Sequence, residues 1–175
     1  MNFKMRFPAR DVSKWAAKYG YGDAAPLSIA PTIQRRGYLT KPEFLSLTRW
    51  KTPRTQKRCA SNSASFIRSV TETALAATDE RLKIEVLTLL PGVSWPTASV
   101  ILHYCARDKY PILDFRALWS LSCNVPDGGY DFDIWWAYCE FTRELSTRLN
   151  VSMRELDKAL WQYSKEKQPA GDQPR

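Results

Sequence analysis

The sequence has little of what metal sites and membrane anchors are built from. It contains a single histidine and four cysteines, and no two of the cysteines form a C-x-x-C pair. Zinc and iron–sulfur centres need clustered thiolates or imidazoles, so we expect no metal site made of side chains. No apolar run approaches the ~18 residues of a membrane span, and the opening MNFKMRFPARD is too polar for a signal peptide. These absences predict an intracellular protein with no membrane partner.

Acidic residues are scarce in one interval of the chain. Between Asp23 and Glu72 the only acid is Glu43, although the net charge of the whole chain is +8. The same interval contains nine basic residues, which are Arg35, Arg36, Lys41, Arg49, Lys51, Arg54, Lys57, Arg58 and Arg68. Clustered cations gain affinity for phosphates by releasing condensed counterions. A basic face kept for solubility is the plainer interpretation, but so one-sided a segment favours a nucleic-acid partner.

Helical periodicity dominates the sequence, and no segment alternates as a strand does. We expect an all-α fold in which residues 1–164 form a single compact helical domain. The polar residues 165–175 are expected to form a disordered tail. Residues 24–40 contain two prolines and a glycine and predict an irregular crossing. Helices are expected at 61–77, 79–90, 96–107, 115–121 and 131–149.

The stretch LLPGVSWPTASVIL, residues 89–102, predicts a helix, a tight turn and a second helix. Gly92 supplies the backbone freedom of a sharp turn, and Ser94 is suited to cap the second helix. Pro96 is tolerated in the first turn of a helix, because the amides there lack intrahelical partners. The remaining amides of such a helix start can hold a phosphate.

The segment LPGVSWPTA resembles the L-P-G-V-G-x-x-T-A signature of the helix-hairpin-helix DNA glycosylases, the superfamily of endonuclease III, adenine glycosylase and 3-methyladenine glycosylase II. In that superfamily a catalytic aspartate lies about eighteen residues beyond a position that is lysine in bifunctional members. Here that position is Pro96, and Asp114 has the family spacing, in YPILDFRAL. Upstream, SNSASFIRSV resembles the helix that precedes the hairpin. The resemblance covers roughly residues 60–120.

The resemblance implies a glycosylase-like fold, with two small helical lobes and a cleft between them. It also implies a DNA-binding hairpin, formed by Pro91, Gly92, Val93, Ser94, Trp95 and Thr97. The chain departs from the family in three respects: Ser94 replaces the second glycine, Phe115 and Arg116 follow the aspartate, and the iron–sulfur cysteines of some members are absent.

The resemblance implies that Asp114 is catalytic. Capping of the helix expected at 115–121 is the plainer role for an aspartate at this position. Because Pro96 has no amine to attack the sugar, the implied chemistry is monofunctional, and water hydrolyses the N-glycosidic bond of a flipped base. The carboxylate of Asp114 would stabilise the positive charge that develops on the deoxyribose and orient the water. The implied partner is double-stranded DNA containing a damaged or modified base. The protein would act as a monomer, in the cytoplasm or associated with the nucleoid.

The basic residues expected to contact DNA are Arg49, Lys51, Arg54, Lys57 and Arg58. Trp50 lies among them, where stacking and phosphate contact combine, so it is a candidate wall of the base pocket or a core residue. Tyr38 and Tyr110 are further candidates for the pocket.

Four other tryptophans, Trp119, Trp135, Trp136 and Trp161, lie on helical patterns and are expected in the core. No cofactor is expected, although the hairpin carbonyls are candidates for a monovalent cation, as in resembling proteins. Two other classes of function stay open: a noncatalytic helix-hairpin-helix DNA-binding protein, and a small RNA-binding or interaction protein.

Overall fold

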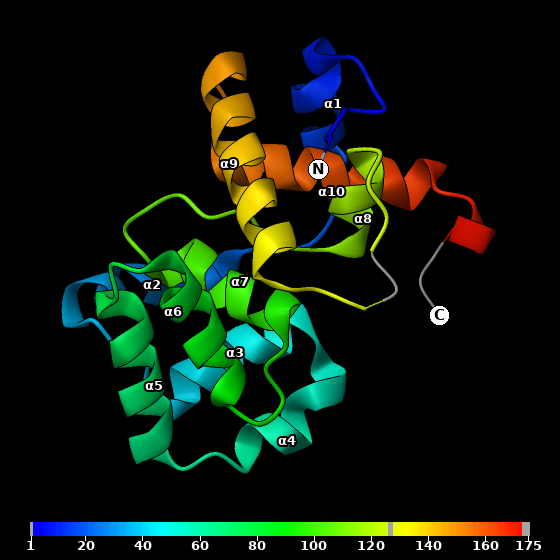
Figure 1. Cartoon of the computed structure of the whole chain (residues 1–175). Coiled ribbons are helices and arrows are strands. Elements are labelled where there is room, and N and C mark those ends of the chain that lie inside the picture. The colour runs from blue at the N-terminus through cyan, green and yellow to red at the C-terminus, as the bar shows by residue number, and fades with distance from the viewer. Residues whose placement is uncertain (1, 126–127, 173–175) are drawn as a thin grey trace. The chain divides into compact units, whose positions relative to one another are not determined.

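The computed structural model describes residues 2–125 and 128–172, all of which form helices, turns or loops without a strand (Figure 1). This confirms the all-α class. The chain divides into two compact units: unit 1 comprises Met1–Tyr21 and Pro111–Arg175, and unit 2 comprises Gly22–Tyr110. None of the described helices combines the length and the hydropathy needed to cross a membrane.

Unit 2 is built around helix α7. Its helices are α2 (Ala24–Arg36), α3 (Lys41–Lys51), η2 (Pro53–Thr55), α4 (Gln56–Ala60), α5 (Ala64–Ala76), α6 (Glu80–Glu85), η3 (Val86–Leu89) and α7 (Trp95–Cys105). Helix α7 contacts α2, α3, α6 and η3, and its Val100, Ile101 and Leu102 are fully buried. A helix that is apolar on nearly every side belongs at the centre of a domain, and α7 lies there.

Residues 24–36 form helix α2, where the sequence predicted an irregular crossing. Pro26 falls in the first turn of the helix, where a missing amide costs no intrahelical bond. Pro31 lies inside the helix and leaves the Leu27 carbonyl without its usual donor. Ala30 and Ile33 are buried, and their packing in unit 2 offsets the local cost of that proline.

Polar contacts fix the start of α3. The Glu43 carboxylate accepts hydrogen bonds from the Thr40 backbone N–H at 2.8 Å and from the Thr40 hydroxyl at 2.7 Å. Arg36 forms an ion pair with the same carboxylate. Partial burial acts to raise the pKa of Glu43, but the hydrogen bonds from Thr40 and Arg36 outweigh it and lower that pKa.

Unit 1 joins the two ends of the chain. Its helices are η1 (Ala9–Asp11), α1 (Val12–Ala17), α8 (Phe115–Ser120), α9 (Phe132–Leu149), α10 (Met153–Lys167) and η4 (Ala170–Asp172). The N-terminal segment runs beside the end of α8, where the backbone N–H groups of Lys4 and Arg6 donate to Leu121 and Ser120, both at 2.9 Å. Helix α10 packs against α1, α8 and α9.

An aromatic cluster forms part of the unit 1 core. The ring of Phe7 lies 6.3 Å from that of Trp15, and Tyr163 lies 4.6 Å from Phe7 and 5.1 Å from Trp15. Of the four tryptophans expected in the core, Trp119 and Trp135 are buried, whereas Trp136 and Trp161 are half-buried.

The C-terminal helix passes residue 164, where the sequence placed the start of a disordered tail. Helix α10 reaches Lys167, and η4 follows it. The Trp119 indole donates to Asp172 at 3.0 Å, and the Gln168 side-chain amide donates to the Asp172 carbonyl at 2.8 Å. These bonds account for the helical structure through residue 172. Residues 173–175 of the expected tail lie outside the described residues.

Candidate nucleic-acid interface

The predicted hairpin lies in unit 2, as the turn between η3 and α7. Gly92 has φ +90°, a conformation that side chains with a Cβ rarely adopt. The Val93 N–H donates to the Leu90 carbonyl at 2.9 Å, and the Ala98 N–H donates to the Ser94 carbonyl at 2.8 Å. These bonds close the turn and begin the helix. The helix, tight turn and helix expected from the sequence are therefore present.

A close approach between backbones explains the glycine. A Cβ on Gly92 would lie 2.7 Å from the Cys59 Sγ, 2.8 Å from the Cys59 backbone nitrogen and 3.1 Å from the Arg58 Cβ. Distances below 3.0 Å to backbone atoms cannot be relieved by rotating a side chain. The turn therefore packs directly on the last residues of α4.

Asn62 holds the two segments together. Its Nδ2 donates to the carbonyls of Cys59 and Pro91, both at 2.9 Å, and its side chain is almost fully buried. The N-cap of the next helix is Ser63 and not Asn62, because the Ser63 hydroxyl accepts from the Phe66 N–H at 3.1 Å. The sequence carries no signal for the contact with Pro91, because that contact spans 29 positions.

Only part of the predicted hairpin faces solvent. Pro91 and Ser94 are exposed and Trp95 is half-buried. Val93 and Thr97 are buried at 8% and 2% exposure. They pack inside unit 2, so a partner at the hairpin would meet Pro91, Ser94 and the backbone. Ser94 is the N-cap residue of α7, but within the described chain its side chain makes no capping hydrogen bond.

The predicted basic residues lie on consecutive elements that lead to the hairpin. Arg49 and Lys51 occupy the last turn of α3, Arg54 lies in η2, and Lys57 and Arg58 lie in α4. All are exposed except Lys51, which is half-buried. Because the hairpin packs on the end of α4, Lys57 and Arg58 lie on the element that supports the turn. The structure thus brings part of the basic segment and the hairpin together within one unit.

Trp50 lies at a cavity of about 370 Å³, whose other lining residues are Ala25, Pro42, Leu45, Ser46 and Arg49. Its indole N–H donates to the Gly22 carbonyl at 2.8 Å, and its ring meets that of Tyr104 edge-on at 5.5 Å. Trp50 is therefore both anchored by unit 2 and adjacent to an exposed arginine. The cavity has the size of ordinary ligand sites.

The other two candidates for the base pocket differ from Trp50. Tyr110 is fully buried, and its hydroxyl donates to Glu80 at 2.7 Å and accepts from Lys83 at 2.8 Å. This corrects its assignment to an open pocket, because its ring is packed on all sides. Tyr38 is half-buried, with the guanidinium of Arg36 at 4.6 Å and that of Arg68 at 4.3 Å from its ring centre.

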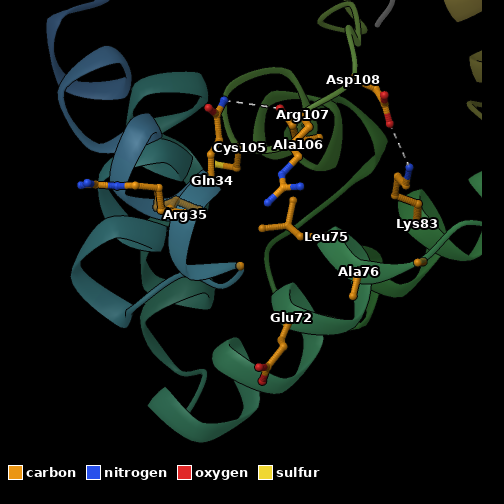
Figure 2. Close-up of a pocket in the computed structure, with 13 residues that line it drawn as sticks. Gln34, Arg35, Glu72, Leu75, Ala76, Lys83, Cys105, Ala106, Arg107 and Asp108 are labelled. Carbon is orange, nitrogen blue, oxygen red and sulfur yellow. Dashed lines mark hydrogen bonds and ion pairs between the residues drawn. The ribbon is translucent and has the colours of Figure 1, made fainter.

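A second cavity, of about 470 Å³, lies at the end of α7 beside α2 and α5. Figure 2 shows Arg107 and Leu75 directed into the same space, and Lys83 paired with Asp108 at 3.6 Å. Cys105 also lines this cavity. Burial, with a smaller effect of the Glu43 charge, raises the pKa of the Cys105 thiol to about 12, so the thiol is not a nucleophile at neutral pH. The described lining contains no aromatic ring on which a base would stack.

Asp114 lies in unit 1, where it is the N-cap residue of α8. Its Oδ1 accepts a hydrogen bond from the Arg116 backbone N–H at 3.0 Å, and the side chain is half-buried. The capping role considered for this residue is confirmed. The Arg116 guanidinium extends over the rings of Phe115 and Trp161, at 4.9 and 5.5 Å.

Two tyrosines share the electrostatic environment of Asp114. Burial raises the pKa of the Tyr130 phenol, and the charge of Asp114 raises it further. Burial also raises the pKa of Tyr138, with added effects of Asp157 and Asp114 among its neighbours. Both phenols stay protonated at neutral pH, and Tyr138 donates to the Ile112 carbonyl at 3.3 Å. The sequence spacing that singles out Asp114 does not predict that Tyr130 and Tyr138 share its electrostatic environment.

Two of the hairpin carbonyls accept hydrogen bonds, that of Leu90 from Val93 and that of Pro91 from Asn62. Because a carbonyl oxygen has two lone pairs, these bonds leave a monovalent cation at the hairpin as a prediction. Among residues 2–125 and 128–172, no group of three histidine, cysteine or acidic side chains is placed to bind a metal ion. None of the four cysteines, all of which lie in the described part of the chain, is in a disulfide.

Comparisons with known proteins assign no family. No family model matches the chain, and neither the curated proteins nor the solved structures contain a significant match.

Replacing Gly92 by alanine is expected to destabilise the protein, because the added Cβ meets the Cys59 backbone and φ must stay near +90°. The free energy of unfolding in urea should fall by more than about 1 kcal/mol. Gly20→Ala is the matched control, since a Cβ there has no atom within 4 Å. Equal unfolding midpoints for the two variants would contradict the close approach.

Asn62→Asp is expected to lower the free energy of unfolding by about 1–3 kcal/mol, since the buried carboxylate no longer donates to Cys59 and Pro91. The same change at exposed Asn124 is the control and should have little effect. Amide hydrogen exchange would show where the structure opens. Faster exchange at residues 90–98 is expected, whereas unchanged exchange there would show that Asn62 does not hold the turn.

Proposed function

We propose that the protein is a monofunctional DNA glycosylase of the helix-hairpin-helix type, which hydrolyses the N-glycosidic bond of a flipped damaged or modified base and leaves an abasic site. The observation that carries this proposal is the packing of the Gly92 turn on the basic helix α4. A tight turn that exposes only the small side chains of Pro91 and Ser94 meets a partner mainly through its backbone, which suits the regular phosphates of DNA.

Unit 2 supplies the proposed binding surface. Anions are favoured at a helix start such as that of α7, where the first backbone N–H groups have no intrahelical acceptor. Exposed Lys57 and Arg58, on the helix that supports the turn, add positive charge for neighbouring phosphates. Pro96, in the first turn of α7, offers neither an amide hydrogen nor an amine. The proposed binding surface therefore holds no amine nucleophile at the position of the bifunctional lysine.

Asp114 supplies the proposed chemistry. The bond from the Arg116 N–H to Oδ1 holds the carboxylate at the start of α8, where it remains half-exposed and accessible to a substrate. A fixed carboxylate stabilises the oxocarbenium-like sugar and orients or deprotonates the attacking water. The protonated Tyr130 phenol contributes a neutral, polar neighbour. Because no amine takes part, the product is an abasic site without strand cleavage.

Trp50 is the proposed wall for stacking of the extruded base. Its ring borders a cavity beside Arg49 and is anchored by the bond to Gly22, so stacking would not require the indole to reorganise. Tyr38 is less suitable, because a base would compete with Arg36 and Arg68 for its ring. The proposed partner is double-stranded DNA with a damaged or modified base, bound by a monomer in the cytoplasm or at the nucleoid.

The second candidate function is a noncatalytic DNA-binding protein with the same hairpin. One observation favours it: capping of α8 already accounts for an aspartate at position 114. An excision experiment on Asp114 separates the two functions.

Asp114→Asn is expected to abolish excision while keeping the fold, because asparagine also caps helices. Duplex oligonucleotides carrying alkylated purines, uracil, hypoxanthine or 8-oxoguanine mispairs would be incubated with the protein, and abasic sites revealed by alkali. For the lesion that is excised, the single-turnover rate should fall at least about 100-fold. DNA affinity should be unchanged or higher, because a negative charge is removed.

Asp131→Asn provides the matched control, since Asp131 caps α9 in the same unit by accepting from the Ile134 N–H at 2.9 Å. This variant should excise at the wild-type rate. Duplex binding by the wild type without excision of any lesion would favour the noncatalytic protein.

Lys57→Gln combined with Arg58→Gln is expected to weaken duplex binding and to reduce its salt dependence. Each phosphate contact that is lost should lower the slope of log K against log[salt] by about 0.9, and therefore by nearly two for the pair. The control is Lys14→Gln with Arg148→Gln, which removes the same charge from exposed positions of unit 1. Equal slopes for the two double variants would show that α4 does not face the DNA.

A further inference from the structure

A group of exposed and half-buried aromatic and basic side chains lies on unit 1, outside the hairpin and the basic segment. We call it the aromatic–cationic surface and define it as Tyr19, Tyr21, Arg116, Lys158, Trp161 and Lys165. The three rings are mutually adjacent. Tyr19 and Tyr21 lie 5.5 Å apart, and each meets Trp161 nearly edge-on, at 5.4 and 5.1 Å.

Basic groups surround these rings. The Lys165 ammonium lies 4.9 Å from the centre of Tyr21 and 5.4 Å from that of Trp161, and the Arg116 guanidinium lies 5.5 Å from Trp161. Lys158 lies 5.7 Å from Tyr19. The cations lie on α8 and α10, Trp161 lies on α10, and the two tyrosines follow α1. Unit 1 therefore brings these side chains together from distant parts of the sequence.

The surface differs from the aromatic core of the same unit. In the core, Phe7 and Trp15 are at most 8% exposed, whereas Tyr21 is 51% exposed and Trp161 is half-buried. Burial of apolar area therefore does not explain a ring at position 21. Lys165 and Arg116 form no ion pair among the described residues, so their charge is not neutralised by the protein itself.

We propose that the aromatic–cationic surface binds single-stranded nucleic acid, with a base stacked on Tyr21 and phosphates contacted by Arg116 and Lys165. Exposed rings interleaved with cations suit a strand whose bases are unpaired, because each unpaired base presents a flat face and each nucleotide a charge. In a duplex the bases are stacked on one another and cannot reach the rings. An acidic peptide would satisfy the cations but leave the rings unused.

This interaction goes beyond the proposed excision chemistry and does not depend on it. It adds to the protein a site for unpaired strand, such as the strand next to a lesion or a single-stranded gap. Binding of single strand at this surface requires neither the carboxylate of Asp114 nor the Gly92 turn.

The test is fluorescence anisotropy with a labelled oligo-deoxythymidine and the full chain. Tyr21→Ala should raise the dissociation constant about fivefold or more, from loss of one stacked base, and Tyr21→Phe should retain wild-type affinity. Lys165→Glu should also weaken binding. Lys167→Glu is its matched control, because Lys167 lies exposed on the same helix without a described ring contact.

Three results would overturn the proposal: equal affinities for Lys165→Glu and Lys167→Glu, wild-type binding by Tyr21→Ala, or polyglutamate bound as tightly as the oligonucleotide. The last would identify an acidic peptide as the ligand. The outcome is distinct from that for excision, since Asp114→Asn should bind oligo-deoxythymidine with wild-type affinity even where excision is lost. Circular dichroism of each variant checks that α10 is intact.

Discussion

The candidate interface of unit 2 depends on the close approach of the Gly92 turn to Cys59. Because a Cβ at position 92 would overlap the Cys59 backbone, the two main chains lie in direct contact, and the hydrogen bond from Asn62 to Pro91 fixes their register. This contact determines where α7 begins, since the same turn leads into it. It also determines where Lys57 and Arg58 lie relative to that helix start. One steric constraint therefore positions both the amides and the charges of the proposed DNA-binding surface.

Pairing within unit 2 reduces the charge that the basic interval offers to a partner. Arg36 pairs with Glu43, and Arg68 lies 3.7 Å from Glu72. Both are thereby partly neutralised, although they belong to the interval that the sequence marks as basic. The exposed cations of this interval without a described ion pair are Arg35, Arg49, Arg54, Lys57 and Arg58. The net charge of the sequence thus overstates the charge available for phosphates. Of the remaining cations, Arg54, Lys57 and Arg58 lie on η2 and α4, the elements that lead to the hairpin.

The N-cap residues in the sequence predicted where helices start better than the sequence patterns predicted the residues of the candidate interface. Asp79, Asp114 and Asp131 each accept a backbone hydrogen bond at the start of a helix that the sequence predicted, and a cap needs only residues two or three positions apart. Helix α2 was missed because its prolines signal a break, whereas the buried Ile33 outweighs the cost of Pro31. Three features could not be predicted, since each depends on packing between distant segments. They are the hydrogen bonds from Asn62, the burial of Thr97 and Tyr110, and the aromatic–cationic surface around Tyr21.

Helix α8 carries Asp114, the candidate catalytic residue, at its start and contacts both the aromatic cluster and the aromatic–cationic surface of unit 1. It has only six residues, too few to be stable alone. Trp119 anchors it beside Tyr163, with ring centres 6.0 Å apart, while Arg116 extends over Trp161. The orientation of the Asp114 carboxylate is therefore set by the packing of α8 on α10 as well as by its own capping bond. A single short helix therefore carries both the proposed catalytic carboxylate and a cation of the aromatic–cationic surface.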